Sequence, residues 1–469
     1  MALLEGLEIS VLKLSSFLSD NIDFRLDAEY FSKQNIRFLN QLSFKGFKTI
    51  SEFAFVTDGI HSSIDYSEDS GIHLISATSP RENIFDLSRK AFITEKAHNE
   101  NPRTALVEND IILSTVGTIG NCAVVTKDML PANSDRHVGI IRITNNVFTP
   151  FYISTFLTTK YGRFQTLRES TGNVQLNLFI YKIRTLKIAN ATDDFQSIIE
   201  KNVLKGIELL NKSDGLIKIC EDKFLAELNI LNWQPTAKNI AIKKFSNSFS
   251  ITGRFDAEYY QPKYDELTKK INAVKHDTLG NLVTFKKSIE PGSDAYQTEG
   301  IAFVRVADIS KFGISETEIH LNRNEFDLDE LKPKKDTILL SKDGSVGIAY
   351  KVEEDLDVIT SSALLHLKLK SKEVLPDYLT LVLNSKLTQM QAERDAGGSI
   401  IQHWRPDEIK QVLIPILPID VQKELTKQIQ QSFKLRKESK RLLEVAKTAV
   451  EMAIEQGEDK AIKFIKANS

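Results

Sequence analysis

The chain has 469 residues, which is enough for two to four domains with complete hydrophobic cores. It is 41% hydrophobic and 26% charged, as ordinary globular proteins are, and its net charge of −2 excludes a globally basic protein while leaving a local basic face open. Its two cysteines, Cys122 and Cys220, share no CxxC spacing, so neither a zinc site nor a disulfide framework is expected.

The hydrophobic stretches of the sequence indicate whether the protein is exported or inserted into a membrane. The first six residues lack a basic segment followed by a long apolar run, so they do not have the pattern of a signal peptide. No apolar run approaches the ~20 residues that cross a membrane. We therefore expect a cytoplasmic protein with no membrane contact.

The first 190 residues predict a helix, a β-rich body and a second helix. Residues 25–42 carry an apolar stripe at helical spacing. Gly117 and Gly120 lie between two short β-rich runs, as turn residues do. A helix is expected from Pro150 to about residue 167, and a strand at 185–188 closes this part. The β-rich runs of the body are 71–76, 110–114, 122–126 and 138–143.

Residues 192–230 have the apolar spacing of a coiled-coil-like helix. Asp214 and Glu221 are expected on the same seam, and Gly215 is a potential helix breaker, so one bent helix and two shorter helices both stay open. Pro235 ends the region, because proline lacks the next backbone donor. The seam residues are Val203, Ile207, Leu210, Ile217, Phe224 and Leu228.

The second half repeats this plan. A helix follows Tyr259, a β-rich body spans about 278–370, and a helix starts at Pro376. A strand at 412–418 leads into a second long helix from Asp420 to about residue 456. Its stripe consists of Val421, Leu425, Ile429, Phe433, Leu443, Ala446, Val450 and Ala453.

Sequence landmarks show that the second half is a copy of the first. The motif Arg-x-Asp-Ala-Glu-Tyr-aromatic at 25–31 returns at 254–260, which is 229 positions later. Other landmarks keep offsets of 226 to 229, as a tandem duplication predicts. Two similar frames with diverged interiors favour one task done on two different targets. The further pairs include Gly71/Gly300, Ser114/Ser341, Gly117/Gly344, Gly120/Gly347, Ser134/Ser361, Gln165/Gln391, Arg168/Arg394 and Gly172/Gly398.

The predicted fold class is therefore α+β, a tandem duplicated unit with two β-rich domains joined by two long antiparallel coiled-coil-like helices. Packing of these helices on each other is the simplest way to bury both seams, and it would hold the β-rich domains apart. The expected segments are 1–190 for the first domain, 191–235 for the first long helix, 236–418 for the second domain, and 419–469 for the second long helix and a partly helical tail.

The chain has no phosphate-binding Walker motif, no GxSxG and no HExxH. Its histidines have no ligand spacing, so no metal site is expected. Asp377, Glu408 and Lys410 fit the loose PD…ExK pattern of metal-dependent nucleases. The first copy has no carboxylates at the matching positions, and Pro376-Asp377 also fits a helix start. No catalytic residue is assigned, but a stand-alone nuclease stays an alternative.

The ordered, duplicated set of motifs resembles the specificity (S) subunit of a Type I restriction–modification system. The resemblance rests on the motif at 25–31 and 254–260, on the Asp-hydrophobic-Ser…Gly-x-x-Gly stretches at 110–120 and 336–347, on 397–399, and on 409–422 before a long helix. It covers nearly the whole chain. The first copy departs from it at Gly172-Asn173 and at residues 186–190, where the second copy has a proline-rich strand end, so identical docking of both copies does not follow.

The resemblance implies two target-recognition domains, each reading one half of a split site in double-stranded DNA. The long helices would fix the gap and dock two methyltransferase (M) subunits, and restriction/translocase (R) subunits would join that core. The S subunit itself is implied to be non-catalytic and to hold no cofactor, since S-adenosylmethionine, ATP and Mg would belong to the partner subunits. A specificity subunit of another phage-defence methylation system, and a non-DNA coiled-coil scaffold, remain alternatives.

Basic residues within the two β-rich domains are the candidate DNA contacts. His403-Trp404-Arg405 joins them, because an aromatic ring beside an arginine can contact a nucleic acid, although a packed tryptophan at a loop corner explains the same residues. The candidates are Arg81, Arg89, Lys90, Arg103 and Arg136 in the first domain, and Lys286, Lys287, Arg305, Lys342, Trp404 and Arg405 in the second.

Overall fold

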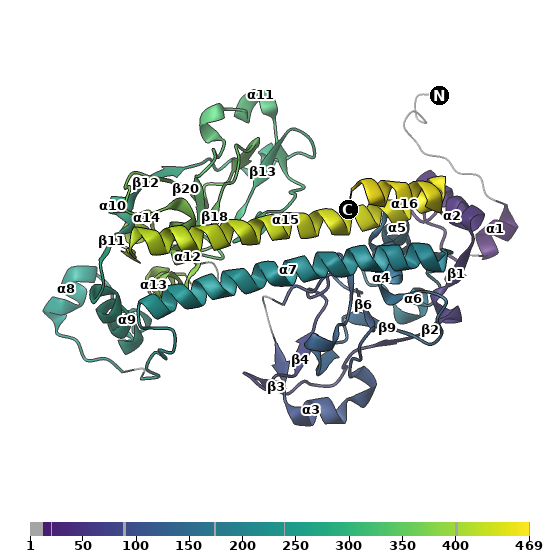
Figure 1. Ribbon diagram of the computed structural model, residues 1–469, viewed down its shortest axis with the longest axis horizontal. Coiled ribbons are helices and arrows are strands. Elements are labelled where there is room, and N and C mark those ends of the chain that lie inside the picture. The colour runs from purple at the N-terminus through teal and green to yellow at the C-terminus, as the bar shows by residue number, and fades with distance from the viewer. Residues whose placement is uncertain are drawn as a thin grey trace. The chain divides into compact units, whose positions relative to one another are not determined.

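The computed structural model describes residues 13–19, 21–87, 91–172, 175–238, 240–398 and 402–468 (Figure 1). The chain divides into two compact units. Unit 1 consists of residues 1–210 and 436–469, and unit 2 consists of residues 211–435. Each unit contains a stretch of both long helices, α7 (Asp193–Glu227) and α15 (Ile419–Gln456).

Unit 1 is built on two four-stranded sheets with strand orders β2-β9-β6-β7 and β3-β5-β4-β8. The first is antiparallel throughout, whereas β4 and β8 run parallel in the second. A two-stranded ribbon of β1 and β10 completes the strands. Their bounds are β1 Phe47–Thr49, β2 Ala54–Asp58, β3 Tyr66–Ser67, β4 His73–Ile75, β5 Phe92–Ile93, β6 Ile111–Ser114, β7 Cys122–Val124, β8 Ala132–Ser134, β9 Val138–Ile143 and β10 Lys187–Ala189.

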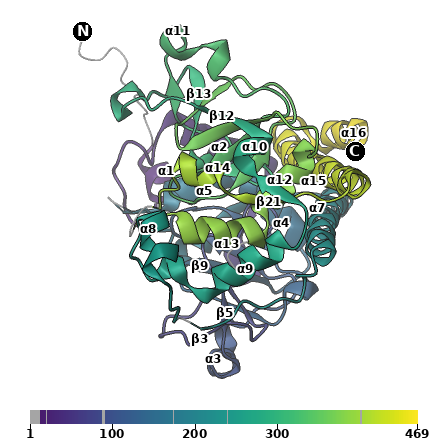
Figure 2. The same cartoon turned by 90° about the vertical axis from the view of Figure 1, so that its left-hand side faces the viewer.

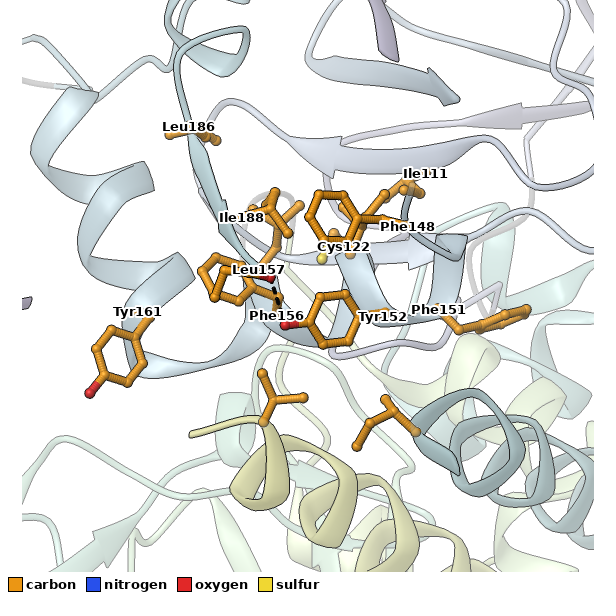
Figure 3. Close-up of a cluster of buried hydrophobic side chains, with 14 of the residues drawn as sticks. Ile111, Cys122, Phe148, Phe151, Tyr152, Phe156, Leu157, Tyr161, Leu186 and Ile188 are labelled. Atoms are coloured by element: carbon orange, nitrogen blue, oxygen red, sulfur yellow. Dashed lines mark hydrogen bonds between the residues drawn. The ribbon is translucent and has the colours of Figure 1, made fainter. Parts of the chain in front are cut away.

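The main core of unit 1 lies between its antiparallel sheet and its helices. Aromatic and aliphatic side chains from β6, α4 and β10 meet there (Figure 3). Tyr152 is buried in this core and donates its hydroxyl hydrogen to the carbonyl of Ala189 at 2.9 Å. The helices are α1 Leu14–Ser19, α2 Lys33–Lys45, α3 Glu95–Glu100, α4 Pro150–Thr158, α5 Lys160–Glu169, α6 Ile180–Ile183 and α16 Glu458–Ala467.

Unit 2 repeats this arrangement. Its four-stranded antiparallel sheet has the order β12-β20-β17-β18, and β13 runs parallel to β19 in a second sheet. The ribbon of β11 and β21 matches that of β1 and β10. The strands are β11 His276–Thr278, β12 Val283–Lys287, β13 Ile301–Val304, β14 Ile309–Ser310, β15 Gly313–Ile314, β16 His320–Leu321, β17 Ile338–Ser341, β18 Ala349–Lys351, β19 Val358–Thr360, β20 Leu364–Leu369 and β21 Leu413–Pro415.

The helices of unit 2 pack like their counterparts in unit 1. Helix α13 lies beside α9 (Figure 2), as α5 lies beside α2 in unit 1. Strand order, parallel pair, ribbon and helix order therefore all recur, and the predicted duplicated α+β fold is confirmed. The bounds are α8 Phe249–Thr252, α9 Pro262–Asn272, α10 Leu279–Leu282, α11 Arg323–Phe326, α12 Pro376–Asn384, α13 Lys386–Asp395 and α14 Pro406–Lys410.

The long helices pair within each unit. In unit 2, the Ser213 and Ser432 hydroxyls lie 2.8 Å apart, and the Cys220 thiol contacts Gln428. Helices α7 and α15 therefore run antiparallel to each other. In unit 1, Ser439 donates to the carbonyl of Gly206 at 2.6 Å. A Cβ at Gly206 would lie 3.0 Å from the Leu443 side chain, which explains the glycine in a helix contact.

Helix α7 is one uninterrupted helix of 35 residues, so of the two alternatives the single helix holds, and Gly215 does not break it. The predicted seam position of Asp214 was wrong, because Asp214 is exposed and the small residues Ser213 and Cys220 occupy the seam instead. Small side chains let two helix backbones approach closely, but a search for hydrophobic residues at helical spacing does not find small polar residues.

The predicted helix at 25–42 begins only at Lys33, where the Ser32 side chain accepts from the backbone N–H of Asn35. Residues 25–31 instead form a clamp. Arg25 pairs with Asp27 at 2.7 Å and donates to the carbonyls of Arg168 and Ser170 at 2.7 and 3.0 Å. Both Arg25 and Arg168 lie over the Tyr30 ring, at 4.8 and 3.5 Å from its centroid.

Unit 2 contains the same clamp. Arg254 pairs with Asp256 and donates to the carbonyl of Asp395 at 2.8 Å. Arg254 and Arg394 lie 4.5 and 5.3 Å from the centroid of Tyr259. The most conspicuous repeat in the sequence therefore fastens residues 25–31 to the end of helix α5 and residues 254–260 to the end of helix α13.

Candidate nucleic-acid interface

Candidate DNA contacts gather at one end of the antiparallel sheet in each unit. In unit 1, β2 and β6 end there and β9 begins, since Asp58 pairs with Gly139 and Ser114 with Val138. We call residues 58–61, 103, 114–121 and 135–137 the unit 1 edge. The unit 2 edge is the equivalent end of the sheet, formed by residues 286–290, 341–347, 361–363 and 402–405.

Arg103 is the most firmly held cation of the unit 1 edge. Its Nη1 donates to the Thr57 hydroxyl, to the carbonyl of Asp58 at 3.1 Å and to the Asp58 carboxylate at 2.9 Å, and its Nη2 donates to the carbonyl of Gly59 at 3.3 Å. His61 shares the same carboxylate at 2.6 Å. Burial raises the pKa of Asp58, but the hydrogen bonds from His61 and Arg103 outweigh it and lower that pKa below its usual value.

Arg136 is exposed beside this group, and its Nε lies 3.4 Å from a ring nitrogen of His137. His137 in turn lies 3.6 Å from Asp135. Arg81 lies outside the edge, in the turn that its backbone N–H closes with Ile84, and is loosely paired with Asp86 at 3.5 Å. Arg89 and Lys90 lie outside the described residues.

The candidate cations of the unit 2 edge are Lys286, Lys287, Lys342 and Arg405. Lys286 donates to the carbonyl of Glu330, and Lys287 is exposed without a hydrogen bond or ion pair to any described residue. Lys342 pairs with Asp343, which also holds His403 at 2.8 Å. Two backbone hydrogen bonds hold residues 402–404 against residues 342–344. The N–H of Gly344 donates to the carbonyl of Gln402 at 2.9 Å, and the N–H of Trp404 donates to the carbonyl of Lys342 at 2.7 Å.

Three further candidates of unit 2 differ in accessibility. Trp404 is only 1% exposed and belongs to the core of the unit, so the packed alternative holds in this structure and its ring is not a surface contact. The Arg405 side chain is 71% exposed, but Glu408 binds both its Nε and Nη2. Arg305 lies directly after β13, beside Asp308 at 3.6 Å.

The residues of the nuclease pattern have separate structural partners. Asp377 is buried, with Lys351 at 2.9 Å and Gln430 at 3.2 Å. Glu408 accepts from the backbone of Arg405 at 3.1 Å, and Lys410 pairs with Asp407 at 2.9 Å. Within the described ranges, no group of three or more His, Cys, Asp or Glu side chains is placed to hold a metal ion.

The Gly-x-x-Gly stretches are turns between β6 and β7 and between β17 and β18. Both glycines of each turn have positive φ angles. A Cβ at Gly120 would lie 2.6 Å from the Thr166 hydroxyl, and one at Gly347 would lie 2.8 Å from the Gln389 amide. The glycines thus let each turn lie against helix α5 or α13.

Sequence reasoning missed three members of the edges. His61 and His137 each lie beside an aspartate, and Asp58 organises the unit 1 group. His403, which the sequence had indicated together with Trp404 and Arg405, lies beside Asp343. No sequence pattern near His61 or His137 indicates that they belong to one edge, because they come together only through strand pairing between segments about 75 residues apart.

Comparisons with known proteins identify a similar domain and a similar protein. Residues 274–445 match the family model of the Type I restriction modification DNA specificity domain. The specificity subunit of type I restriction enzyme EcoBI from Escherichia coli is 23% identical over 201 residues, which are 39% of this chain and 41% of that protein. Residues 274–445 are therefore similar to a Type I restriction modification DNA specificity domain. The matched part spans about two-fifths of the length of this curated relative.

Two solved structures are similar at low identity. The Type I restriction–modification S subunit from M. genitalium is 14% identical, with a TM-score of 0.37, and the match covers 90% of this chain and 95% of that one. The HsdS subunit from Thermoanaerobacter tengcongensis is 13% identical, with a TM-score of 0.28, and the match covers 88% and 97% of the two chains. TM-scores this low do not establish a common arrangement, so the fold rests on the elements of this chain.

In the described part of the chain, no helix is long and apolar enough to cross a membrane.

Proposed function

We propose that this chain is the DNA-reading subunit of a Type I restriction–modification system, and that each unit reads one half of a split site with its edge. The observation that carries the proposal is the repeated edge. The same end of the same sheet gathers cations in both units, yet the residues differ, with Arg103 and Arg136 in unit 1 and Lys286, Lys287 and Lys342 in unit 2. A common frame with different contact residues suits two unlike half-sites.

The edges offer two kinds of contact. Exposed cations such as Lys287 and Arg136 suit phosphate oxygens, which give affinity and register without sequence information. Side chains held in a fixed geometry suit base edges in the major groove, where each base pair presents its own pattern of donors and acceptors. Arg405 and Arg305 would also contact phosphates if DNA phosphates replaced their carboxylate partners, Glu408 and Asp308. Arg81, which lies outside the edge, remains a candidate, as do Arg89 and Lys90, which lie outside the described residues.

The proposal assigns catalysis to partners. Two methyltransferase subunits would supply S-adenosylmethionine chemistry, and restriction/translocase subunits would supply ATP- and Mg-dependent steps. The specificity-domain match at residues 274–445 supports this assignment, together with separate protein partners for Asp377, Glu408 and Lys410. The same features would suit a specificity subunit of another phage-defence methylation system. The neighbouring genes would show which of the two systems the chain serves.

The test is long-read sequencing of genomic adenine methylation in the native host with and without the gene. Loss of methylation at one split motif on deletion is the expected result. Exchange of residues 47–190 for those of another family member should change only one half of that motif. Unchanged methylation, together with no salt-dependent DNA binding by the purified complex, would overturn the proposal and favour a protein-binding scaffold.

A further inference from the structure

Arg103 differs from the other described candidate arginines in how its guanidinium is bound. Four hydrogen bonds pin the group, three from Nη1 and one from Nη2, to acceptors on the successive residues Thr57, Asp58 and Gly59. Its side chain is nevertheless 52% exposed. The guanidinium is therefore fixed in place while part of it stays open to solvent.

The unused donors of Arg103 form a pair. A guanidinium carries five N–H groups in a rigid planar fork. The bonds to residues 57–59 engage both hydrogens of Nη1 and one hydrogen of Nη2. Nε donates to no described residue, so Nε–H and one Nη2–H remain. Because Nη1 and Nη2 serve successive residues, we assign the Gly59 bond to the Nη2 hydrogen beside Nη1. The remaining Nη2–H is then parallel to Nε–H on one edge of the guanidinium, as needed to bind two acceptors at once.

The other exposed arginines of the two edges lack this free pair. Glu408 takes both Nε and Nη2 of Arg405. The Nε of Arg136 faces His137 at 3.4 Å, and no protein group fixes the rest of its guanidinium among the described residues. Among the arginines of the two edges that the structure describes, only Arg103 combines a fixed guanidinium with an open pair of donors.

We propose that Arg103 reads a guanine in the half-site bound by unit 1, with Nε–H and Nη2–H donating to O6 and N7 in the major groove. This inference rests on the proposed function. A bidentate arginine–guanine pair is the commonest specific contact of this kind. Because the guanidinium is already fixed, less side-chain entropy is lost when it binds a base. A fixed geometry is also what a contact that distinguishes between bases requires.

A phosphate would satisfy the same fork, but the surroundings favour a base. The Asp58 carboxylate lies 2.9 Å from Nη1 and 2.6 Å from His61. Its charge opposes an anion at the open side of Arg103 more than it opposes a neutral guanine edge. Unit 2 has Glu330 at the approximately equivalent position, so the predicted guanine contact belongs to unit 1 alone.

The experiment measures the affinity of the purified host complex for duplexes in which each base pair of the wild-type site is replaced in turn. The variants are Arg103→Lys, which keeps the charge but loses the fork, and Arg103→Gln, whose amide suits adenine. Arg136→Lys is the matched control at the same edge. The wild type should prefer guanine at one position by about ten- to a hundredfold.

Arg103→Lys should abolish that preference at that position only, Arg103→Gln should shift it toward adenine, and Arg136→Lys should leave it intact. Retention of every preference by both Arg103 variants would overturn the inference. An equal loss for all sequences with a shallower salt dependence would identify a phosphate contact instead and overturn it too. A wild-type complex without any sequence preference would instead refute the proposed function, which separates the two failures.

Discussion

The edges of units 1 and 2 occupy equivalent places in equivalent sheets and differ in their candidate contact residues. In the unit 1 edge Asp58 holds the guanidinium of Arg103, whereas in the unit 2 edge Asp343 holds the ammonium group of Lys342. A planar guanidinium suits directional contacts and an ammonium behaves as a point charge. The two edges thus suggest different mixtures of base reading and phosphate binding.

The frames behind the edges differ much less. Gln165 in unit 1 and Gln391 in unit 2 each close two hydrogen bonds with the backbone of the ribbon strand, at Lys187 and Leu413 respectively. The Arg–Asp clamps and the tyrosine hydroxyls on β10 and β21 also recur. Buried polar groups need their partners, so these bonds tolerate little change, while exposed edge residues are free to diverge.

The largest expected effect comes from a core position where the units differ. Unit 2 buries the Lys351–Asp377 pair at 2.9 Å, where unit 1 places the buried residues Val124 and Phe151. Lys351→Val should destabilise unit 2 by about 3–5 kcal/mol, because it leaves a buried carboxylate without its cation. Urea unfolding with hydrogen-exchange readout of each unit measures this loss.

The matched control is the double variant Lys351→Val with Asp377→Phe, which gives unit 2 the residues of unit 1. Removal of both charges should restore most of the lost stability, because a buried ion pair contributes little over an apolar pair. A double variant as unstable as the single one would show that the ion pair itself stabilises unit 2.

A second difference predicts that acid destabilises unit 2 more than unit 1. His366 on β20 occupies the register of Ile140 on β9 and is buried with its ring 2.7 Å from the Thr360 hydroxyl. Burial, followed by the charges of Lys286 and Lys368, lowers the pKa of His366 to about 4. An unfolded histidine titrates near 6.5, so between these values the unfolded state binds more protons.

The stability contributed by neutral His366 is therefore complete above about pH 6.5 and declines as the pH falls toward 4, by on the order of 3 kcal/mol. Hydrogen exchange of residues 338–369 should show this acid loss, and that of 111–143 should show less. His366→Ile should flatten the pH dependence of unit 2. An unchanged slope in that variant would assign the acid sensitivity to other groups.

The conserved frame gives a prediction of equal effects. Gln165→Ala and Gln391→Ala should each destabilise their own unit by about 1–3 kcal/mol, because each leaves buried backbone groups of the ribbon without partners. Urea unfolding of the two variants checks this. Markedly unequal losses would mean that the two frames are less alike in energy than in geometry.

The sequence predicted the parts of the fold that depend on local pattern. The duplication, both long helices and the strands at 111–114 and 338–341 follow from periodicity and landmarks within short windows. The small seam residues Gly206, Ser213 and Cys220 escaped, because close backbone approach leaves no apolar signal. The edges escaped in part for another reason. Arg103 meets Thr57 across 46 positions, and Trp404 is buried by contacts that no local window contains.

The smallest expected effect tests the phosphate contacts of the unit 2 edge. Lys287 is exposed and unpaired among the described residues, so Lys287→Ala should leave stability unchanged within about 0.5 kcal/mol. If the ammonium neutralises one phosphate, the slope of log affinity against log salt should fall by about 1, and all DNA sequences should be affected alike. Lys334→Ala is the matched control, because that lysine already pairs with Asp329. A sequence-dependent loss at Lys287 would instead make this lysine a base-reading residue, and the two edges would then differ in which base they read and not in the kind of contact they make.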